Sequence, residues 1–358
     1  MNLYVHFPFC RSKCAYCALH SYVGRSEDER RRYVTHIVRV LEHLFADLQP
    51  TTRNLQLSTL YFGGGTPALC ELQPIFDCLA PHLQLPTAAR VDARYPNAKL
   101  PTEFTVELNP LDVTPTLLNQ LKTGGVNRLS MGVQSFDDTV LRSMGRSHTA
   151  TQALDAWRMI RDAGFDNAGI DLICGWPEGH DSWQRTLDSA STLSPDHCSV
   201  YTLILEPKTR LAHDVERRRV QLPSDDVALA ELAAAERALT AAGLERYEIS
   251  SFAKPGKECR HNLATWRGED YIGIGDGACS REGNAVSRVI FRLRLLKEGF
   301  SPTQAAADFP ELAPRVTEWC ATLDRYVTEG LLTRLPPATY LLTPRGAEVC
   351  DSILADLI

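Results

Sequence analysis

The chain has 358 residues, of which 44% are hydrophobic and 23% charged; this balance is typical of a folded protein and excludes a disordered or fibrous one. Asp and Glu number 44 against 38 Lys and Arg, which gives a net charge of -6. Such a charge leaves no broad cationic surface and argues against general nucleic-acid binding. The length favours a large α/β unit with a smaller second one.

The sequence carries no signal for a membrane or for export. No apolar run approaches the roughly 20 residues that span a bilayer, and the start MNLYVHFPFCRSKC lacks the layout of a signal peptide. We therefore expect a cytoplasmic protein without a transmembrane segment, and leave peripheral membrane contact and the oligomeric state open. The 11 Cys, an odd number in such a chain, argue against a disulfide scaffold.

The first part of the chain alternates short β-rich runs with amphipathic stretches, which predicts a parallel sheet with crossover helices. Ser26 and Glu29 have the spacing of a capping box at the start of the first helix. Helices are expected to begin near Ser26, Glu71, Pro115, Ala150 and Ser182. The predicted strands are Asn2–Phe7, Leu57–Phe62, Glu103–Leu108, Asn127–Val133, Asn167–Ile173 and His197–Leu203.

The pattern changes along the chain. The stretch Leu85–Pro101 contains three Pro, which predicts an irregular surface insertion. After Leu205 the strand–helix alternation fades, and an Ala-rich helix is expected over Asp225–Ala242. From about Ser301 the order helix, helix, ribbon, helix indicates a small C-terminal module. We therefore divide the chain into a core at 1–205, a second region at 206–290 and a module at 291–358.

A cysteine motif follows the first predicted strand. Cys10, Cys14 and Cys17 form C-x3-C-x2-C, and thiolates brought together bind metal. A tetrahedral zinc site needs a fourth ligand, which His20 could supply. An iron–sulfur cube held by three Cys instead leaves one iron open to a substrate or cofactor. The spacing alone leaves zinc, an iron–sulfur cluster and a catalytic disulfide as alternatives.

The second predicted strand ends in a glycine run, YFGGGTP at Tyr61–Pro67. Such a run lets a ligand lie against the backbone, although it lacks the spacing of a P-loop or a dinucleotide fingerprint. Polar residues also end the next three predicted strands. Arg146, in MGRSHTA, would supply a positive charge near an anionic group of a ligand. Each of the strand-end residues alone could be a helix cap. Because strand ends share one rim in a βα barrel, we expect one site beside the Cys loop, with Glu107, Gln134, Ser135 and Asp171.

Together these residues resemble the radical S-adenosylmethionine superfamily and, within it, the HemW heme chaperones and the related oxygen-independent coproporphyrinogen oxidases (HemN). The resemblance runs through YVHFPFCRSKCAYC, YFGGGTP, VELNP, RLSMGVQSFDD, MGRSHTA, DLICGWP, YEISSFAKPGKECRHNLATWRGEDYIGIGDGA and LLTPRGAEVCDSIL. It covers nearly the whole chain, with a weaker zone at Leu85–Lys99. It implies an α/β fold, an incomplete (β/α)6 TIM-type barrel with a small C-terminal helical, winged-helix-like module.

The resemblance also implies the cofactors and their residues. Cys10, Cys14 and Cys17 would hold a [4Fe-4S] cluster whose fourth iron is chelated by S-adenosylmethionine, and this cofactor would perform the radical chemistry. A second S-adenosylmethionine would lie against Gln134, Arg146 and Asp171. The remaining cofactor contacts implied are Tyr4, Tyr16, Gly64, Gly65, Thr66 and Glu107.

Two features separate the chaperone from the oxidase. The oxidase motif has another Cys two positions after the third, where this chain has Leu19, and this favours HemW. Chaperones carry His-Asn-x-x-Tyr-Trp, linked to heme binding, and here the stretch runs from His261 to Trp266 with Thr265 in the place of Tyr. His261 would bind heme iron through a neutral imidazole; without the resemblance, it would be a helix-start or core residue.

Two departures from the family bear on the site. The chain lacks a stretch between Ser280 and Arg292 that would help to wall the site, and GWPEGHDSW brings Trp176 and His180 near the rim. A buried aromatic strut is the expected role of Trp176, with stacking on a macrocycle as the alternative. We expect a heme chaperone-like protein that delivers heme to a recipient hemoprotein. The alternatives are a radical decarboxylase of coproporphyrinogen and a zinc-stabilised α/β domain without redox chemistry.

Overall fold

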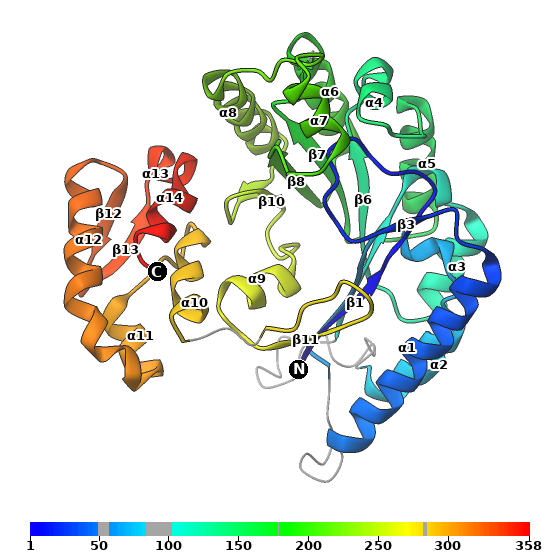
Figure 1. The fold of residues 1–358 in the computed structure, drawn as a ribbon, viewed down its shortest axis with the longest axis horizontal. Helices are drawn as coiled ribbons and strands as arrows, with labels where there is room; N and C mark the ends of the chain where they lie inside the picture. The colour runs from blue at the N-terminus through cyan, green and yellow to red at the C-terminus, as the bar shows by residue number, and fades with distance from the viewer. Residues whose placement is uncertain (49–56, 84–101, 178, 282–284) are drawn as a thin grey trace.

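A computed structural model describes residues 1–48, 57–83, 102–177, 179–281 and 285–358. Its central sheet has the order β11-β1-β4-β5-β6-β7-β8-β10-β9 (Figure 1). Two strands have the predicted bounds, and the other four are displaced by one or two residues at one or both ends. The parallel strands are β1 (Asn2–Phe7), β4 (Thr59–Gly64), β5 (Glu103–Leu108), β6 (Arg128–Gln134), β7 (Ala168–Cys174) and β8 (His197–Thr202).

The sheet curves into an incomplete barrel. Strand β11 (Tyr271–Ile274) joins β1 in parallel, whereas β10 (Ser251–Ala253) and β9 (Glu245–Arg246) extend the other edge antiparallel. Within the described residues the two outermost strands, β11 and β9, do not pair with each other. The prediction of an incomplete α/β barrel is therefore confirmed.

Helices cover the outer face of the sheet (Figure 1). The capping box at the first helix is present, because Ser26 N donates to Glu29 Oε2 at 2.8 Å and Glu29 N donates to Ser26 Oγ at 3.3 Å. The short α4 and α7 were not predicted. The α-helices between residues 1 and 241 are α1 (Glu27–Leu48), α2 (Gln73–Leu79), α3 (Pro115–Thr123), α4 (Asp138–Ser143), α5 (Ala150–Asp162), α6 (His180–Leu193), α7 (Arg210–Glu216) and α8 (Asp225–Ala241).

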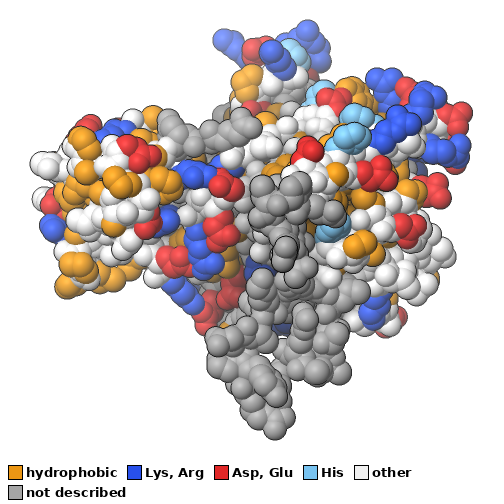
Figure 2. All heavy atoms as spheres, turned by 90° about the horizontal axis from the view of Figure 1, so that it is seen from below, with side chains coloured by type: hydrophobic (Ala, Val, Ile, Leu, Met, Phe, Trp, Pro, Cys, Tyr) orange, Lys and Arg blue, Asp and Glu red, His pale blue; other side chains and the backbone are white. Residues whose placement is uncertain are grey.

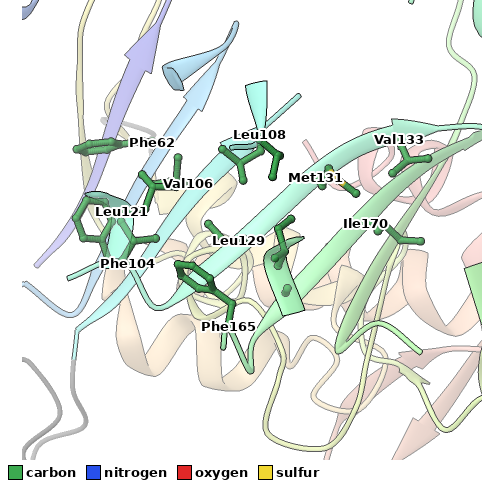
Figure 3. Close-up of a cluster of buried hydrophobic side chains, with 14 of the residues drawn as sticks. Phe62, Phe104, Val106, Leu108, Leu121, Leu129, Met131, Val133, Phe165 and Ile170 are labelled. Carbon is green, nitrogen blue, oxygen red and sulfur yellow. The ribbon is translucent and has the colours of Figure 1, made fainter. Parts of the chain in front are cut away.

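Alternate strand residues point outward and form the main core (Figure 3). Phe62 of β4 and Phe104 of β5 meet edge to face with ring centroids 4.8 Å apart, and Phe76 of α2 stacks on Phe62 at 6.3 Å. Each such fully buried ring contributes about 1.5–3 kcal/mol to stability. This apolar layer fixes the register of the strands, because a slip of one residue would turn it toward the barrel interior.

The inward-facing residues of the same strands are polar. In the paired register Asn2 lies beside Thr59 and Tyr4 beside Tyr61, while Thr59 lies beside Glu103. The barrel therefore has polar layers stacked along its axis instead of an apolar filling. Such an interior suits the binding of a polar or charged ligand.

The C-terminal part builds a second hydrophobic core around Phe300, Trp319 and Tyr340. Its helix, helix, ribbon, helix order agrees with the predicted pattern. The domain bounds at 205 and 290 stay predictions. Helix α9 (Arg260–Trp266) precedes this part and is bonded to the sheet. The elements of the C-terminal part are α10 (Ala285–Ile290), α11 (Pro302–Asp308), α12 (Val316–Thr328), β12 (Leu332–Leu335), β13 (Thr339–Leu342), α13 (Pro344–Glu348) and α14 (Cys350–Ala355).

Two sequence predictions fall wholly or partly outside the described residues. The insertion Leu85–Pro101 lies outside them entirely, and the shortened stretch between Ser280 and Arg292 does so at 282–284. None of the helices in the described ranges combines the length and apolar character needed to cross a bilayer. On the face shown in Figure 2, Lys and Arg are interspersed with Asp and Glu.

Candidate cofactor site

A cavity of about 650 Å³ opens at the carboxyl ends of the parallel strands. Its wall includes the predicted cluster and cofactor residues except Tyr4 and His261. The prediction for Ser135 was wrong, because its side chain is buried and its Oγ lies 3.3 Å from Thr186 Oγ1 on α6. The topology explains this convergence, because the carboxyl ends of parallel strands share one rim. The predicted residues that line it are Cys10, Cys14, Tyr16, Cys17, Gly64, Gly65, Thr66, Glu107, Gln134, Arg146 and Asp171.

The Cys motif begins at the last residue of β2 (Phe9–Cys10) and continues in the loop to β3 (Tyr22–Val23), and these two short strands pair in parallel. The loop is tied to the rim from several directions. Ala15 N donates to Met144 O at 2.8 Å, and Leu211 N donates to Ala15 O at 2.9 Å. Arg11 donates from Nη2 to Oδ1 of the buried Asp112 at 2.6 Å. These bonds hold the three thiols at the cavity wall.

The donor set fits a multi-iron cluster. Burial raises the pKa of the Cys10 and Cys17 thiols, so the positive charge of bound iron would have to stabilise the thiolates. In the described ranges no three His, Cys, Asp or Glu side chains converge on the position of one metal ion. The three thiols line the same cavity, as a [4Fe-4S] cube requires, because each Cys of such a site binds a different iron.

His20, the candidate fourth zinc ligand, is bonded elsewhere. Its Nε2 lies 3.0 Å from Tyr22 Oη and 3.2 Å from Asp276 Oδ2. The imidazole is therefore part of a polar cluster at β3. It does not line the cavity with the thiols.

The glycine run is required by packing. Gly64 has φ +101°, and a Cβ there would collide with the His6 ring. A Cβ on Gly65 would lie 2.6 Å from Phe9 O and 2.7 Å from Phe7 O. Because both glycines also line the cavity, the tight packing leaves backbone exposed to a ligand.

Glu107 is the acidic group beside this run. Its Oε1 accepts a hydrogen bond from Tyr61 Oη at 2.8 Å, and its Oε2 accepts one from Gly64 N at 3.2 Å. Burial is the main reason that its pKa is raised to about 7. A cationic ligand in the cavity would favour the ionised form.

Three further polar residues complete the rim. Gln134 lies at the end of β6, Asp171 lies on β7, and Arg146 follows α4. Gln134 has φ +70°, at a register shift between β6 and β7. Asp171 accepts from Ser130 Oγ at 3.2 Å, and burial raises its pKa. Arg146 donates from Nη2 to Gly132 O at 2.5 Å and from Nη1 to Cys14 Sγ at 3.6 Å. A positive and a negative group thus face the same cavity.

Tyr4 lies one layer below the cavity. His6 Nε2 is 2.9 Å from His20 O, a carbonyl that can only accept, so this nitrogen carries the proton. Nδ1 of His6 then accepts from Tyr4 Oη at 3.0 Å. Tyr4 therefore acts on the Cys loop through His6 and does not line the cavity itself.

His261 lies at the amino-terminal end of the sheet, opposite the cavity. Its side chain is buried, with 7% of the residue exposed. Asn2 Nδ2 donates to Glu269, which leaves Asn2 Oδ1 to accept from Thr59 Oγ1 at 2.9 Å. Thr59 Oγ1 must then accept from His261 Nδ1 at 2.8 Å, so the proton is on Nδ1.

Trp176 and His180 occupy different places. Trp176 is 4% exposed, packs edge to face on Tyr16 with centroids 5.9 Å apart, and donates from Nε1 to Ser143 Oγ at 2.8 Å. It is the buried strut expected from the sequence. His180 Nδ1 lies 3.0 Å from the buried Glu231 Oε1 and does not line the cavity.

Several lining residues were missed by sequence reasoning. Tyr201 and Thr202 end β8, and Asn109 follows β5. The rule applied to Glu107 and Asp171, a polar residue at a strand end, would have found all three. Arg11 offered no comparable signal, because its partner Asp112 is far away in the sequence.

Comparisons with known proteins agree with this geometry. The radical SAM superfamily matches residues 4–190. The heme chaperone HemW of Escherichia coli is 36% identical over 282 residues, 78% of this chain and 69% of that protein. HemW of Bacillus subtilis is 34% identical over 281 residues, 77% of this chain and 70% of that protein.

A solved structure gives the same fold. The coproporphyrinogen III oxidase HemN of Escherichia coli, a radical SAM enzyme, superposes with a TM-score of 0.78 over 99% of this chain and 89% of that chain, at 22% identity. At this identity, the similarity between this chain and HemN shows a shared fold. The sequence relatives, the superfamily match and the three-thiol cavity show that the chain belongs to the radical SAM superfamily and, within it, to the HemW family.

Proposed function

We propose that this chain is a heme chaperone-like radical SAM protein that binds a [4Fe-4S] cluster, S-adenosylmethionine and heme, and delivers heme to a recipient hemoprotein. The observation that carries the proposal is the meeting of three thiols, a glycine run and polar strand ends around one cavity. The similarity to HemW proteins, which are named heme chaperones, supports the binding and delivery of heme.

The chain's residues would divide the work in the cavity. Cys10, Cys14 and Cys17 would hold the cluster, which with S-adenosylmethionine supplies one-electron and radical chemistry when bound. Glu107 would face a cationic part of the cofactor, because its carboxylate is otherwise disfavoured by burial. Gln134 and Asp171 would supply further hydrogen-bonding groups, including those for a second cofactor molecule.

His261 is our proposed heme ligand. Burial lowers its pKa to about 4, so the imidazole is neutral at physiological pH. With the proton on Nδ1, the lone pair is on Nε2, the form that binds iron. Because the ring is buried against β4, heme binding at His261 requires α9 to move away from the sheet.

The test combines a heme titration with product analysis after anaerobic reconstitution. The proposal expects about one heme per chain and no consumption of coproporphyrinogen in the presence of S-adenosylmethionine and a reductant. His261→Ala should bind heme at least tenfold more weakly, about 1.4 kcal/mol, with unchanged cluster absorbance. His180→Ala, an exposed His on α6, is the matched control.

Two outcomes would contradict the proposal. Conversion of coproporphyrinogen to protoporphyrinogen would identify an oxidase. A heme titration that is the same for His261→Ala and the wild type would remove His261 from the heme site.

A further inference from the structure

Arg146 directly follows Met144 and Gly145, two residues that lie against the Cys loop. Met144 O accepts from Ala15 N at 2.8 Å. Gly145 has φ +76°, and a Cβ there would lie 3.4 Å from Ala15 N and 3.6 Å from Cys14 Cα. The turn before Arg146 is thus hydrogen-bonded to the Cys loop and passes close to the backbone of Cys14.

The guanidinium is directed at sulfur and not at a carboxylate. Nη1 donates to Cys14 Sγ at 3.6 Å, and Nη2 donates to Gly132 O at 2.5 Å. Besides Cys14, Arg146 has the Tyr16 hydroxyl as a side-chain neighbour. Within the described chain no Asp or Glu forms an ion pair with Arg146, and its buried Nε has no hydrogen-bond partner. The positive charge of Arg146 is therefore not neutralised by an ion pair and lies next to one cluster ligand.

The electrostatic consequence follows from how protein groups tune iron–sulfur clusters. Reduction adds an electron, and a nearby cation with an N–H to sulfur bond stabilises that more negative state. The effect is larger in a partly water-excluded cavity than in water. Of the three Cys, the thiol of Cys14 alone is hydrogen-bonded to an Arg within the described residues.

We propose that Arg146 raises the reduction potential of the cluster by donating a hydrogen bond from Nη1 to Cys14 Sγ. The inference rests on the cluster of the proposed function. In this role Arg146 acts on the cluster through Cys14 and makes the cluster easier to reduce. This goes beyond the cofactor contact implied by the family resemblance. The proposed role depends on the contact between Arg146 Nη1 and Cys14 Sγ. It does not depend on which protein receives the heme.

The test is the midpoint potential of the reconstituted cluster, followed by electron paramagnetic resonance during redox potentiometry. Arg146→Met removes the charge and both donors, and should shift the reduction equilibrium at least tenfold toward the oxidised form, which is 59 mV for one electron. Arg146→Lys keeps the charge without the fork geometry and should fall between Met and the wild type. Arg142→Met is the control, because Arg142 on α4 is exposed and bonds to Thr139.

Each outcome decides the matter. A wild-type potential in Arg146→Met with full iron and sulfide would overturn the proposal. Failure of both Arg146 variants to take up iron, while Arg142→Met does so normally, would also overturn it by making Arg146 a residue of cluster assembly. Absence of a cluster in the wild type would instead refute the proposed function, and iron analysis of the wild type separates these cases.

Discussion

Glu107 illustrates how a single side chain prepares the cavity for a cation. Tyr61 Oη and Gly64 N both donate to its carboxyl group, yet burial outweighs them and raises the pKa to about 7. In the folded chain the protonated form is therefore favoured. Its contribution to stability is complete below the unfolded pKa of about 4.5 and is lost as pH rises through about 7.

Replacing this group should alter the pH dependence of stability. In the cluster-free chain, Glu107→Gln should lose less unfolding free energy than the wild type between about pH 5 and about pH 8. Asp171, whose pKa is also raised, is present in both proteins, so its effect largely cancels in the difference. Urea unfolding at several pH values measures the change. Parallel profiles for the two proteins would contradict this account, and Glu27→Gln, an exposed residue of α1, is the control.

The sequence could predict the position of some site residues but not of others. Glu107, Gln134 and Asp171 could be placed at the cavity because they end consecutive strands of a parallel sheet. Tyr4 and His261 could not, since motif membership does not tell which layer of the barrel a side chain occupies. Arg146 has a contact with Cys14 Sγ that only the tertiary fold creates.

At the scale of elements, α9 closes the amino-terminal end of the barrel. The carboxylate of Glu103 accepts hydrogen bonds from Arg260 N and His261 N, both at 3.0 Å. Thr59 on β4 holds the His261 ring from the other side. The segment linked by resemblance to heme is therefore fastened to two strands of the sheet.

Loosening this attachment should expose α9. Glu103→Gln weakens two charge-assisted bonds and should cost about 1.5–3 kcal/mol of stability. Amide hydrogen exchange over Arg260–Trp266 should accelerate. Heme uptake should also become faster, because heme binding at His261 requires α9 to move away from the sheet. Mass-spectrometric exchange and stopped-flow mixing with heme measure both. Unchanged exchange in α9 would contradict this role, and Glu29→Gln at the α1 capping box is the control.

Element prediction succeeded where the pattern is local. Strands β1 and β5 have their predicted bounds because polar and apolar residues alternate along them. The two- to four-residue strands β9, β10 and β11 were missed, since they exist through pairing with distant strands. The register shift at Gln134 likewise depends on the neighbouring strand and left no sequence signal.

At the scale of the whole molecule, the two faces of the central sheet have different tasks. An outward apolar layer carries the stability of the sheet, and the inner face is left free for polar residues. The parallel order then gathers the strand ends around the Cys loop. This is why a sequence reading of strand ends and a Cys motif located the cavity, although it could not give the layers beneath it.

The central claim is that three Cys hold a four-iron cube with one iron left for the cofactor. Metal and acid-labile sulfide analysis after oxygen-free reconstitution, with wild type and Cys14→Ser side by side, tests it most directly. We expect about four iron and four sulfide per wild-type chain and an electron paramagnetic resonance signal that changes when S-adenosylmethionine is added. Cys14→Ser should lose iron while its circular dichroism stays unchanged. A colourless wild type holding one tightly bound zinc would contradict it.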